Sequence, residues 1–205
     1  MLIRLTRRQL FLAAPALAQL QQTPMQTIGP FYPADRPTDQ DADLTVIKGK
    51  AGRAKGQLLY VTGRVMDDKG EPVRGARLEI WQCNAAGKYR HPGDTSDTPL
   101  DPNFEGFGVV TTDKDGRYRF KTIKPGAYAV SKTAWRPPHI HFDITGKQTR
   151  IITQLYFPNE PLNEKDSLYK GTRRVEALVA KVVGPEKGME PEAKIAVWDV
   201  VLNRG

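Results

Sequence analysis

The feature that most constrains this fold is a series of short apolar segments separated by turn sequences. LLYVTGRVM (58–66) and RYRFKTI (117–123) alternate apolar with polar residues or are rich in β-branched ones, and DDKGEP (67–72) and DKDG (113–116) separate such segments. Alternation with a period of two is typical of β-strands, and clusters of Gly, Asp and Pro are typical of turns. The chain is therefore predicted to be all-β.

Strand-like segments of this kind continue to the C-terminus and predict an antiparallel β-sandwich with long active-site loops in one domain, residues 57–205. Residues 19–56 have no sustained period and predict an extended N-terminal arm. The polar stretch 84–106 is too long for a simple connection and is expected to carry function or to become ordered only in an assembly. The longest helical candidate is the short segment 162–169. The other expected strands are 76–82, 107–112, 127–130, 139–144, 151–157, 175–183 and 194–202.

Residues 1–18 have the layout of a secretory signal peptide. A basic start is followed by an apolar stretch and by Ala16-x-Ala18, a small-residue cleavage site, and the apolar part is too short to span a bilayer. The pair Arg7-Arg8 resembles a twin-arginine signal. We expect export to the periplasm or the medium by that route. The alternative is a basic N-terminus with a chance arginine pair, in which case the protein is cytoplasmic.

Charge and cysteine content exclude several classes of protein. The formal net charge of +8 falls to +5 without residues 1–18, which hold three arginines and no acid, and the remaining basic residues form no stripe with interleaved aromatics. Nucleic-acid binding is therefore not expected, and neither is membrane association once the signal is removed. Cys83, the one cysteine, excludes an internal disulfide and a thiolate metal cluster. Its place in LEIWQC predicts a buried apolar side chain.

Two of the three histidines stand one residue apart in WRPPHIHFDI (135–144). On a strand, His139 and His141 point to the same face about 6.5–7 Å apart, which lets two imidazoles bind one metal ion. The two prolines before them are typical of an edge strand or of the start of a strand, and favour an exposed or cleft-facing position. The alternative is a pair of surface or half-buried histidines without a metal.

Several residues could complete such a metal site. Asp143 continues the same face and would give a two-histidine, one-carboxylate centre for Fe(II) or Zn, although three ligands on one strand would be crowded. A cupin-type centre would need a Glu soon after His141, where the sequence has Thr145 and Gly146.

Two tyrosines offer oxygen ligands of another kind, Tyr89 in the polar loop and Tyr128 after a Pro-Gly pair. A phenol with a pKa of about 10 loses its proton only to a strongly acidic metal ion, so two tyrosinates and two imidazoles would favour Fe(III). On composition alone, however, a tyrosine near a turn is more often simply a half-buried aromatic. The residues alone leave these alternatives open.

An ordered set of motifs resembles the intradiol ring-cleavage dioxygenases, and most of all the β-type chains that act on protocatechuate. The resemblance extends from TIGPFYP at 27–33 to about residue 157, and it is specific because all the motifs occur in order. The others are GEPVRGARLEIWQCNAAGKYRH, LDPNFEGFG, TDKDGRYRFKTIKPGAY, WRPPHIHFDI and ITQLYF.

The resemblance implies a mononuclear, non-haem Fe(III) with two tyrosine and two histidine ligands. Motif by motif, the ligands would be Tyr89, Tyr128, His139 and His141. Arg136 in WRPPH and Gln154 in ITQLYF would line the substrate pocket. Tyr128 would also accept a substrate proton, and Arg136 would stabilise developing negative charge. The resemblance thus implies three catalytic residues, Arg136, Tyr128 and Gln154.

The resemblance also implies an activity and partners. A catechol, protocatechuate or a related compound, would be cleaved by O2 between its two hydroxylated carbons to a cis,cis-muconate, without an external reductant. The segment 129–138 is shorter than in the β-type chains, which leaves the natural catechol open. The classical enzyme with a β-type chain pairs two different chains, so either a homo-oligomer or a complex with an α-type chain is expected.

A second resemblance gives a different function. GRVMDDKGEPVRGARLEIW (63–81) is similar to the transthyretin-like sandwich modules that serve as non-catalytic units of secreted proteins. Such a binding module would give no reason for two tyrosines, two histidines and Arg136 to occur together.

Overall fold

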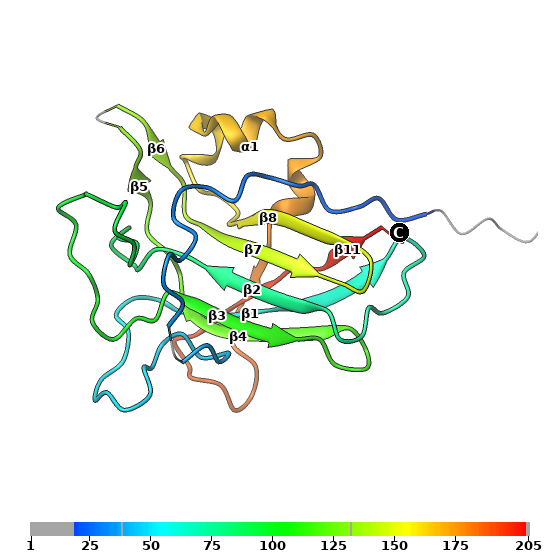
Figure 1. The fold of residues 1–205 in the computed structure, drawn as a ribbon, viewed down its shortest axis with the longest axis horizontal. Helices are drawn as coiled ribbons and strands as arrows, with labels where there is room; N and C mark the ends of the chain where they lie inside the picture. Colours follow the sequence, from blue (N-terminus) through cyan, green and yellow to red (C-terminus); the bar gives the residue numbers. More distant parts are fainter. Residues whose placement is uncertain (1–18, 38, 132, 204–205) are drawn as a thin grey trace, which may run out of the picture.

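Two β-sheets packed face to face form the body of the protein (Figure 1). The structure, a computed structural model, describes residues 19–37, 39–131 and 133–203. The predicted signal peptide at 1–18 lies outside the described residues. No helix among the described residues is long and apolar enough to cross a membrane.

The first sheet is built around the long strand β1 (Leu58–Asp67), which has neighbours on both sides. Strand β4 (Arg117–Ile123) pairs antiparallel along one side. On the other side the two last strands, β10 (Lys194–Val197) and β11 (Val200–Leu202), follow one another and both pair parallel to β1. Strand β9 (Lys181–Val183) completes this sheet antiparallel to β10.

The second sheet is fully antiparallel, in the order β3-β2-β7-β8. A two-stranded ribbon, β5 (Tyr128–Ala129) with β6 (Trp135–Arg136), lies at the end of this sheet where β7 begins, at the upper left of Figure 1. The bounds of the four strands are β2 (Arg77–Trp81), β3 (Phe107–Thr111), β7 (His139–Thr145) and β8 (Arg150–Tyr156).

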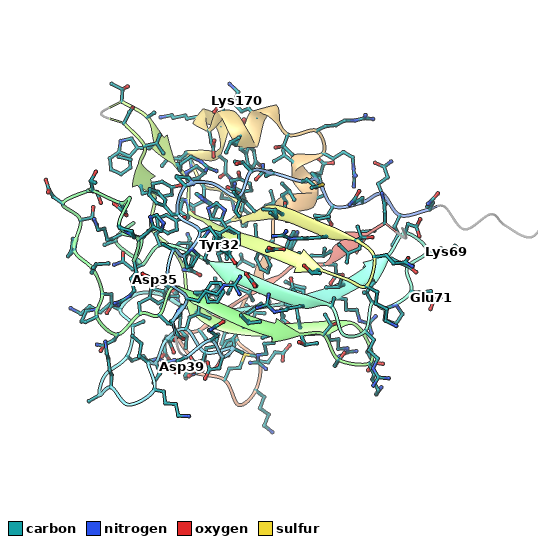
Figure 2. The ribbon with its side chains drawn as sticks, in the orientation of Figure 1. Tyr32, Asp35, Asp39, Lys69, Glu71 and Lys170 are labelled. Atoms are coloured by element: carbon teal, nitrogen blue, oxygen red, sulfur yellow. The ribbon has the colours of Figure 1, made fainter. Side chains whose placement is uncertain are left out.

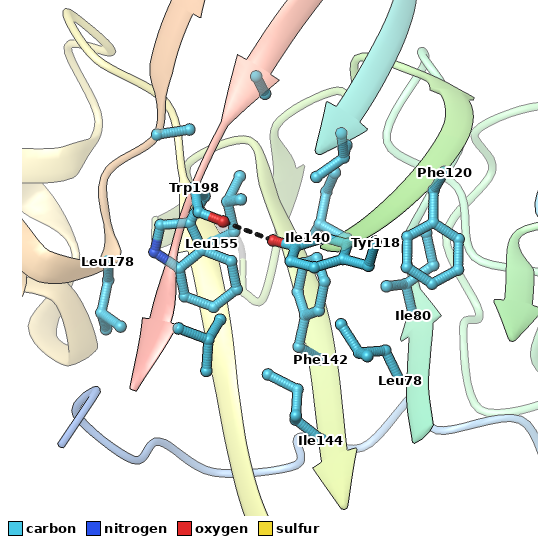
Figure 3. Packing of buried hydrophobic residues seen from close by; sticks show 14 of the residues in the cluster. Leu78, Ile80, Tyr118, Phe120, Ile140, Phe142, Ile144, Leu155, Leu178 and Trp198 are labelled. Carbon is cyan, nitrogen blue, oxygen red and sulfur yellow. Dashed lines mark hydrogen bonds between the residues drawn. The ribbon is translucent and has the colours of Figure 1, made fainter. Parts of the chain in front are cut away.

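The apolar core lies between the two sheets (Figure 3). Phe142 of β7 is fully buried, and its ring lies 4.9 Å from that of Trp198 and 6.2 Å from that of Tyr118, centroid to centroid. The Tyr118 hydroxyl donates to the Trp198 carbonyl at 2.7 Å, which satisfies the polar atom of a buried aromatic side chain. Alternate residues of the strands supply this core, as the period of two requires.

The N-terminal arm covers the opposite face of the second sheet. The backbone amide of Gln26 donates to the Ile152 carbonyl at 2.9 Å, and the Thr153 hydroxyl donates to the Pro24 carbonyl at 2.7 Å. Figure 1 shows the arm running along β8. Residues 139–144 of β7 are consequently buried on both faces.

The prediction of an all-β sandwich with an extended arm is confirmed, with two parallel pairings in the first sheet as a refinement. Cys83 is buried, as predicted. The helical segment resolves into the 3-10 turn η1 (Asn163–Lys165) and the helix α1 (Ser167–Gly171).

Two strand predictions were wrong in extent. Residues 175–183 begin with a 3-10 turn, η2 (Val175–Leu178), and only 181–183 form a strand. The Trp198 indole N–H donates to the Ala177 carbonyl at 2.8 Å, so a tertiary contact holds the turn against the strand preference of the segment. Residues 127–130 contribute only the two residues of β5.

Candidate metal centre

The two histidines of β7 lie side by side with their Nε2 atoms 3.2 Å apart. Both side chains are buried, because the arm covers this face of the sheet. Strand β7 is an inner strand, between β2 and β8. Of the two positions that the prolines indicated, the edge strand is therefore wrong, and the start of a strand is confirmed, because the prolines lie immediately before β7. The expected exposure of this start is wrong at His139, which is buried.

Their surroundings prepare both imidazoles to be neutral ligands. The Nδ1 of His139 lies 2.7 Å from the Pro137 carbonyl, which can only accept, so the proton sits on Nδ1 and Nε2 presents a lone pair. Burial lowers the pKa of His139 well below its usual value, with smaller contributions from His141 and Arg136. Burial, helped by Arg136, lowers the pKa of His141 to about 3.

The two predicted tyrosines lie beside these histidines. The Tyr128 ring centroid is 5.5 Å from that of His139 and 5.3 Å from that of Tyr89, and the Tyr89 ring is 6.4 Å from that of His141. The Tyr89 hydroxyl is buried and makes no hydrogen bond of acceptable geometry with any described residue. A buried polar atom without a partner is unfavourable and needs an explanation such as an ion.

Local sequence positions both tyrosines. The Asn84 side-chain oxygen accepts from the amides of Ala86 and Lys88 and so shapes the loop before Tyr89. Gly87 has a φ of +90°, and a Cβ there would lie 2.3 Å from the Ala127 carbonyl oxygen. Glycine at this position thus lets the NAAGKY loop contact the chain next to Tyr128.

The donor set fits Fe(III). Burial raises the pKa of Tyr89 well above its usual value, with a contribution from Tyr128, and burial also raises the pKa of Tyr128. Only a strongly acidic cation displaces protons from such phenols, and hard Fe(III) is such an ion. The unpartnered Tyr89 hydroxyl and the two facing Nε2 atoms are the features that a bound ion would satisfy.

The carboxylate alternative does not fit. Asp143 lies on the same face, but Arg150 holds it through three contacts, the shortest 2.6 Å between Nη2 and Oδ2. Among the described residues, no carboxylate or thiol groups with both imidazoles within 4.8 Å. A site with two histidines and Asp143 for Fe(II) or Zn is therefore excluded by this geometry.

Arg136 projects from β6 beside the four candidate ligands. Its Nη2 donates to the Gln154 side-chain oxygen at 2.7 Å and to the Tyr156 hydroxyl at 3.1 Å, and its Nε donates to Asp166 at 2.8 Å. Register pairing places Arg136 opposite Tyr128 and Gln154 opposite His141. The structure thus brings together all six residues that the sequence predicted.

Several neighbours were not predicted as site residues. The Trp81 ring stacks on His141 at 4.8 Å, and Phe31 of the arm stacks on Tyr89 at 4.6 Å. A Cβ on Gly29 would lie 3.1 Å from the His141 ring. The motif TIGPFYP was a signal for the arm residues, because its glycine and aromatic fall in a segment with no strand pattern. Tyr156 falls in the motif ITQLYF, which also contains Gln154, whereas Asp166 lies outside all the quoted motifs.

The fold and these side chains define a β-sandwich protein with a two-tyrosine, two-histidine centre. Comparison with known proteins identifies the family to which this fold belongs. The Dioxygenase family model matches residues 27–204. The protocatechuate 3,4-dioxygenase β chain of Burkholderia cepacia is 50% identical over 147 residues, 70% of this chain and 63% of that relative. The α chain from the same organism is 32% identical over 152 residues, 70% of this chain and 74% of that one.

A solved structure gives the same result. The dioxygenase domain of a dioxygenase–carbohydrate-binding protein fusion from Streptomyces sp. SirexAA-E superposes with a TM-score of 0.67 at 29% identity, over 90% of this chain and all of that one. The chain belongs to the intradiol ring-cleavage dioxygenase family. It spans less than two thirds of the length of the β-chain relative.

Proposed function

We propose that this chain is a non-haem Fe(III) enzyme that uses O2 to cleave a catechol between its two hydroxylated carbons, giving a cis,cis-muconate. Protocatechuate or a related diphenol is the proposed substrate, by similarity to the Burkholderia cepacia chains. The observation that carries the proposal is the convergence of two imidazole Nε2 atoms and the unpartnered Tyr89 hydroxyl in one buried place.

Each residue has a defined task in this proposal. Tyr89, Tyr128, His139 and His141 hold the iron. The chemistry that bound Fe(III) supplies is Lewis acidity toward the diphenol oxygens and withdrawal of electron density, which makes the ring reactive toward O2. The Tyr128 oxygen is placed to take up a substrate proton.

Arg136 acts as a fixed cation beside the reacting anion. Its three hydrogen-bond partners hold the guanidinium in place before substrate arrives, so little reorganisation is needed when negative charge develops. Gln154 orients Arg136 through its side-chain oxygen, and its own amide is held by the Thr27 carbonyl at 3.2 Å. The arm therefore helps to position a catalytic residue.

The test is a visible absorption spectrum of the purified protein before and after anaerobic addition of catechol or protocatechuate. We expect a burgundy tyrosinate-to-iron band that moves to longer wavelength with the preferred diphenol. Tyr89→Phe should lose the band, whereas Tyr118→Phe, a buried tyrosine of the core, should keep it. A colourless protein that takes up no iron would leave the non-catalytic sandwich module as the function.

Assembly and location are part of the proposal. We expect the chain to work with copies of itself or with an α-type chain, and turnover by the purified chain alone would decide for the first. We also propose that residues 1–18 direct export by the twin-arginine route. Fractionation of cells that express wild type or Arg7→Lys/Arg8→Lys tests this, since retention of only the variant is expected.

A further inference from the structure

A second group of metal-ligating side chains lies outside the proposed iron centre, where the arm meets the beginning of β3. Carboxylate oxygens of Asp39, Asp41 and Glu105 all lie within 4.8 Å of one another. Asp39 and Asp41 come from the arm, in the pattern DQDAD, and Glu105 comes from LDPNFEGFG. Figure 2 shows Asp39 below Asp35 and Tyr32, at the side of the molecule where the loops gather.

Glu105 is the residue that makes this group more than a patch of surface acids. Its side chain is buried, with the residue 4% exposed, and neither carboxylate oxygen has a hydrogen-bond partner among the described residues. An ionised carboxylate in this state is strongly unfavourable, so Glu105 either keeps a proton or binds a counter-charge. Its oxygens instead face two further carboxylates.

No protein cation neutralises the three acids. Among the described residues, no Lys or Arg lies within ion-pair distance of Asp39, Asp41 or Glu105. The nearby Arg90 uses its Nη2 for the carbonyls of Asp101 and Phe104, at 3.1 and 3.2 Å.

Asp39 accepts from the Lys48 backbone amide at 3.0 Å and Asp41 from the Asp43 backbone amide at 2.7 Å, whereas Asp43 also has a cation beside it. Its carboxylate accepts from the Thr45 amide at 3.0 Å and lies 3.6 Å from the Lys121 ammonium. It is therefore already satisfied.

The backbone holds the three carboxylates in place. The Glu105 amide donates to the Leu44 carbonyl at 3.1 Å, and the Val109 amide donates to the Gln40 carbonyl at 2.9 Å. On the other side of the arm, the Lys121 amide donates to the Ala42 carbonyl at 2.7 Å. The arm is thus paired to two strands at this point, so the carboxylates converge because of the fold and not by side-chain chance.

We propose that Asp39, Asp41 and Glu105 form a Ca²⁺ site that ties the N-terminal arm to the beginning of β3. Ca²⁺ prefers hard oxygen ligands, accepts carboxylates in flexible geometry and fills its remaining positions with water. Asp41 is exposed and Asp39 half-exposed, so the ion can enter from solvent and keep water ligands. Glu105 also lines a cavity of about 650 Å³ that Tyr89 and Phe31 border.

Calorimetric titration of the iron-loaded full-length protein with CaCl2, in buffer freed of divalent ions, tests this site. We expect one Ca²⁺ per chain and a higher Tm in its presence, because a ligand that binds only the folded state stabilises it. Glu105→Gln should weaken binding at least tenfold. Asp35→Asn, which removes an equal charge from an exposed part of the same arm, should leave it unchanged.

Asp41→Asn provides a second test at an exposed position, where folding is not at risk. It should also weaken Ca²⁺ binding while iron content and the circular dichroism spectrum stay as in wild type. Wild type that binds no Ca²⁺ at millimolar concentration would overturn the proposal, as would equal binding by wild type, Glu105→Gln and Asp41→Asn. Neither result would affect the iron centre, whose colour is measured separately.

Discussion

The two faces of strand β7 are equally buried but for different reasons. Ile140, Phe142 and Ile144 face the opposite sheet and form part of the apolar core. His139 and His141 face away from it and are buried, and Gly29 of the N-terminal arm lies against the His141 ring. The first face is buried by the packing of two sheets, and the second by a segment without regular structure. Burial alone therefore does not distinguish a stabilising side chain from a functional one.

The polar face of β7 also contains an ion pair. Asp143 follows the histidines on the same face and is held by Arg150 from the neighbouring strand. On the same face of β7, a candidate metal ligand, His141, is thus followed two residues later by Asp143, which forms an ion pair. The chemistry of each side chain and its partners makes the difference, since the backbone geometry is the same.

The largest effect is expected on the polar face. His141→Gln should remove iron, colour and turnover, with activity down more than the roughly 10–100-fold typical when only a supporting residue is lost. Metal analysis and oxygen-uptake assays measure this. His91→Gln, the same change at the loop histidine, is the control and should keep its iron. Full iron content in His141→Gln would contradict the assignment.

On the core face the expected loss is one of stability. Phe142→Ala should lower the free energy of unfolding by about 3–5 kcal/mol, because a fully buried aromatic leaves a cavity. Denaturant titration measures it, and Val130→Ala, at an exposed position, should change little. The folded fraction of Phe142→Ala should still bind one iron per chain. If the folded fraction of Phe142→Ala contained less than one iron per chain, the two faces would not be independent.

Arg136→Gln sharpens the distinction between holding the metal and using it. We expect kcat/KM to fall about 100–1000-fold, the range for loss of one group that stabilises a developing anion, with iron content unchanged. Because this change leaves the buried Asp166 without its ion-pair partner, Arg136→Gln/Asp166→Asn serves as a control for stability. Loss of iron in both variants would assign Arg136 a structural role.

The last comparison concerns pH and the acidic group at the arm. Burial, together with Asp39, Asp41 and Asp43 and against the opposing charge of Arg90, raises the pKa of Glu105 from 4.5 to about 8. Between these values the folded state keeps a proton that the unfolded chain releases, so the free energy of unfolding should fall as pH rises and level off above pH 8. Glu105→Gln should flatten this slope, as should saturating Ca²⁺, in unfolding measured across pH 5–9. An identical slope in Glu105→Gln would exclude Glu105 as its source.

The local sequence pattern determined the positions of most strands and the face on which the two histidines lie. The period of two and the Gly, Asp and Pro turns specified the strands, because each strand must present alternate side chains to a core. The same period placed His139 and His141 on one face. The assignment of Tyr89, Tyr128, Arg136 and Gln154 to the same site depended on resemblance, since no spacing rule relates residues so far apart in the chain.

Tertiary structure decided the rest. Pairing of β5 with β6 and of β7 with β8 put Arg136 beside Tyr128 and Gln154 beside His141, and sequence separation does not encode such neighbours. The coverage of β7 by the arm, the turn at 175–178 and the convergence of Glu105 with Asp39 likewise depend on contacts between distant segments. Alternation specifies which face a residue takes, but only packing specifies what meets that face.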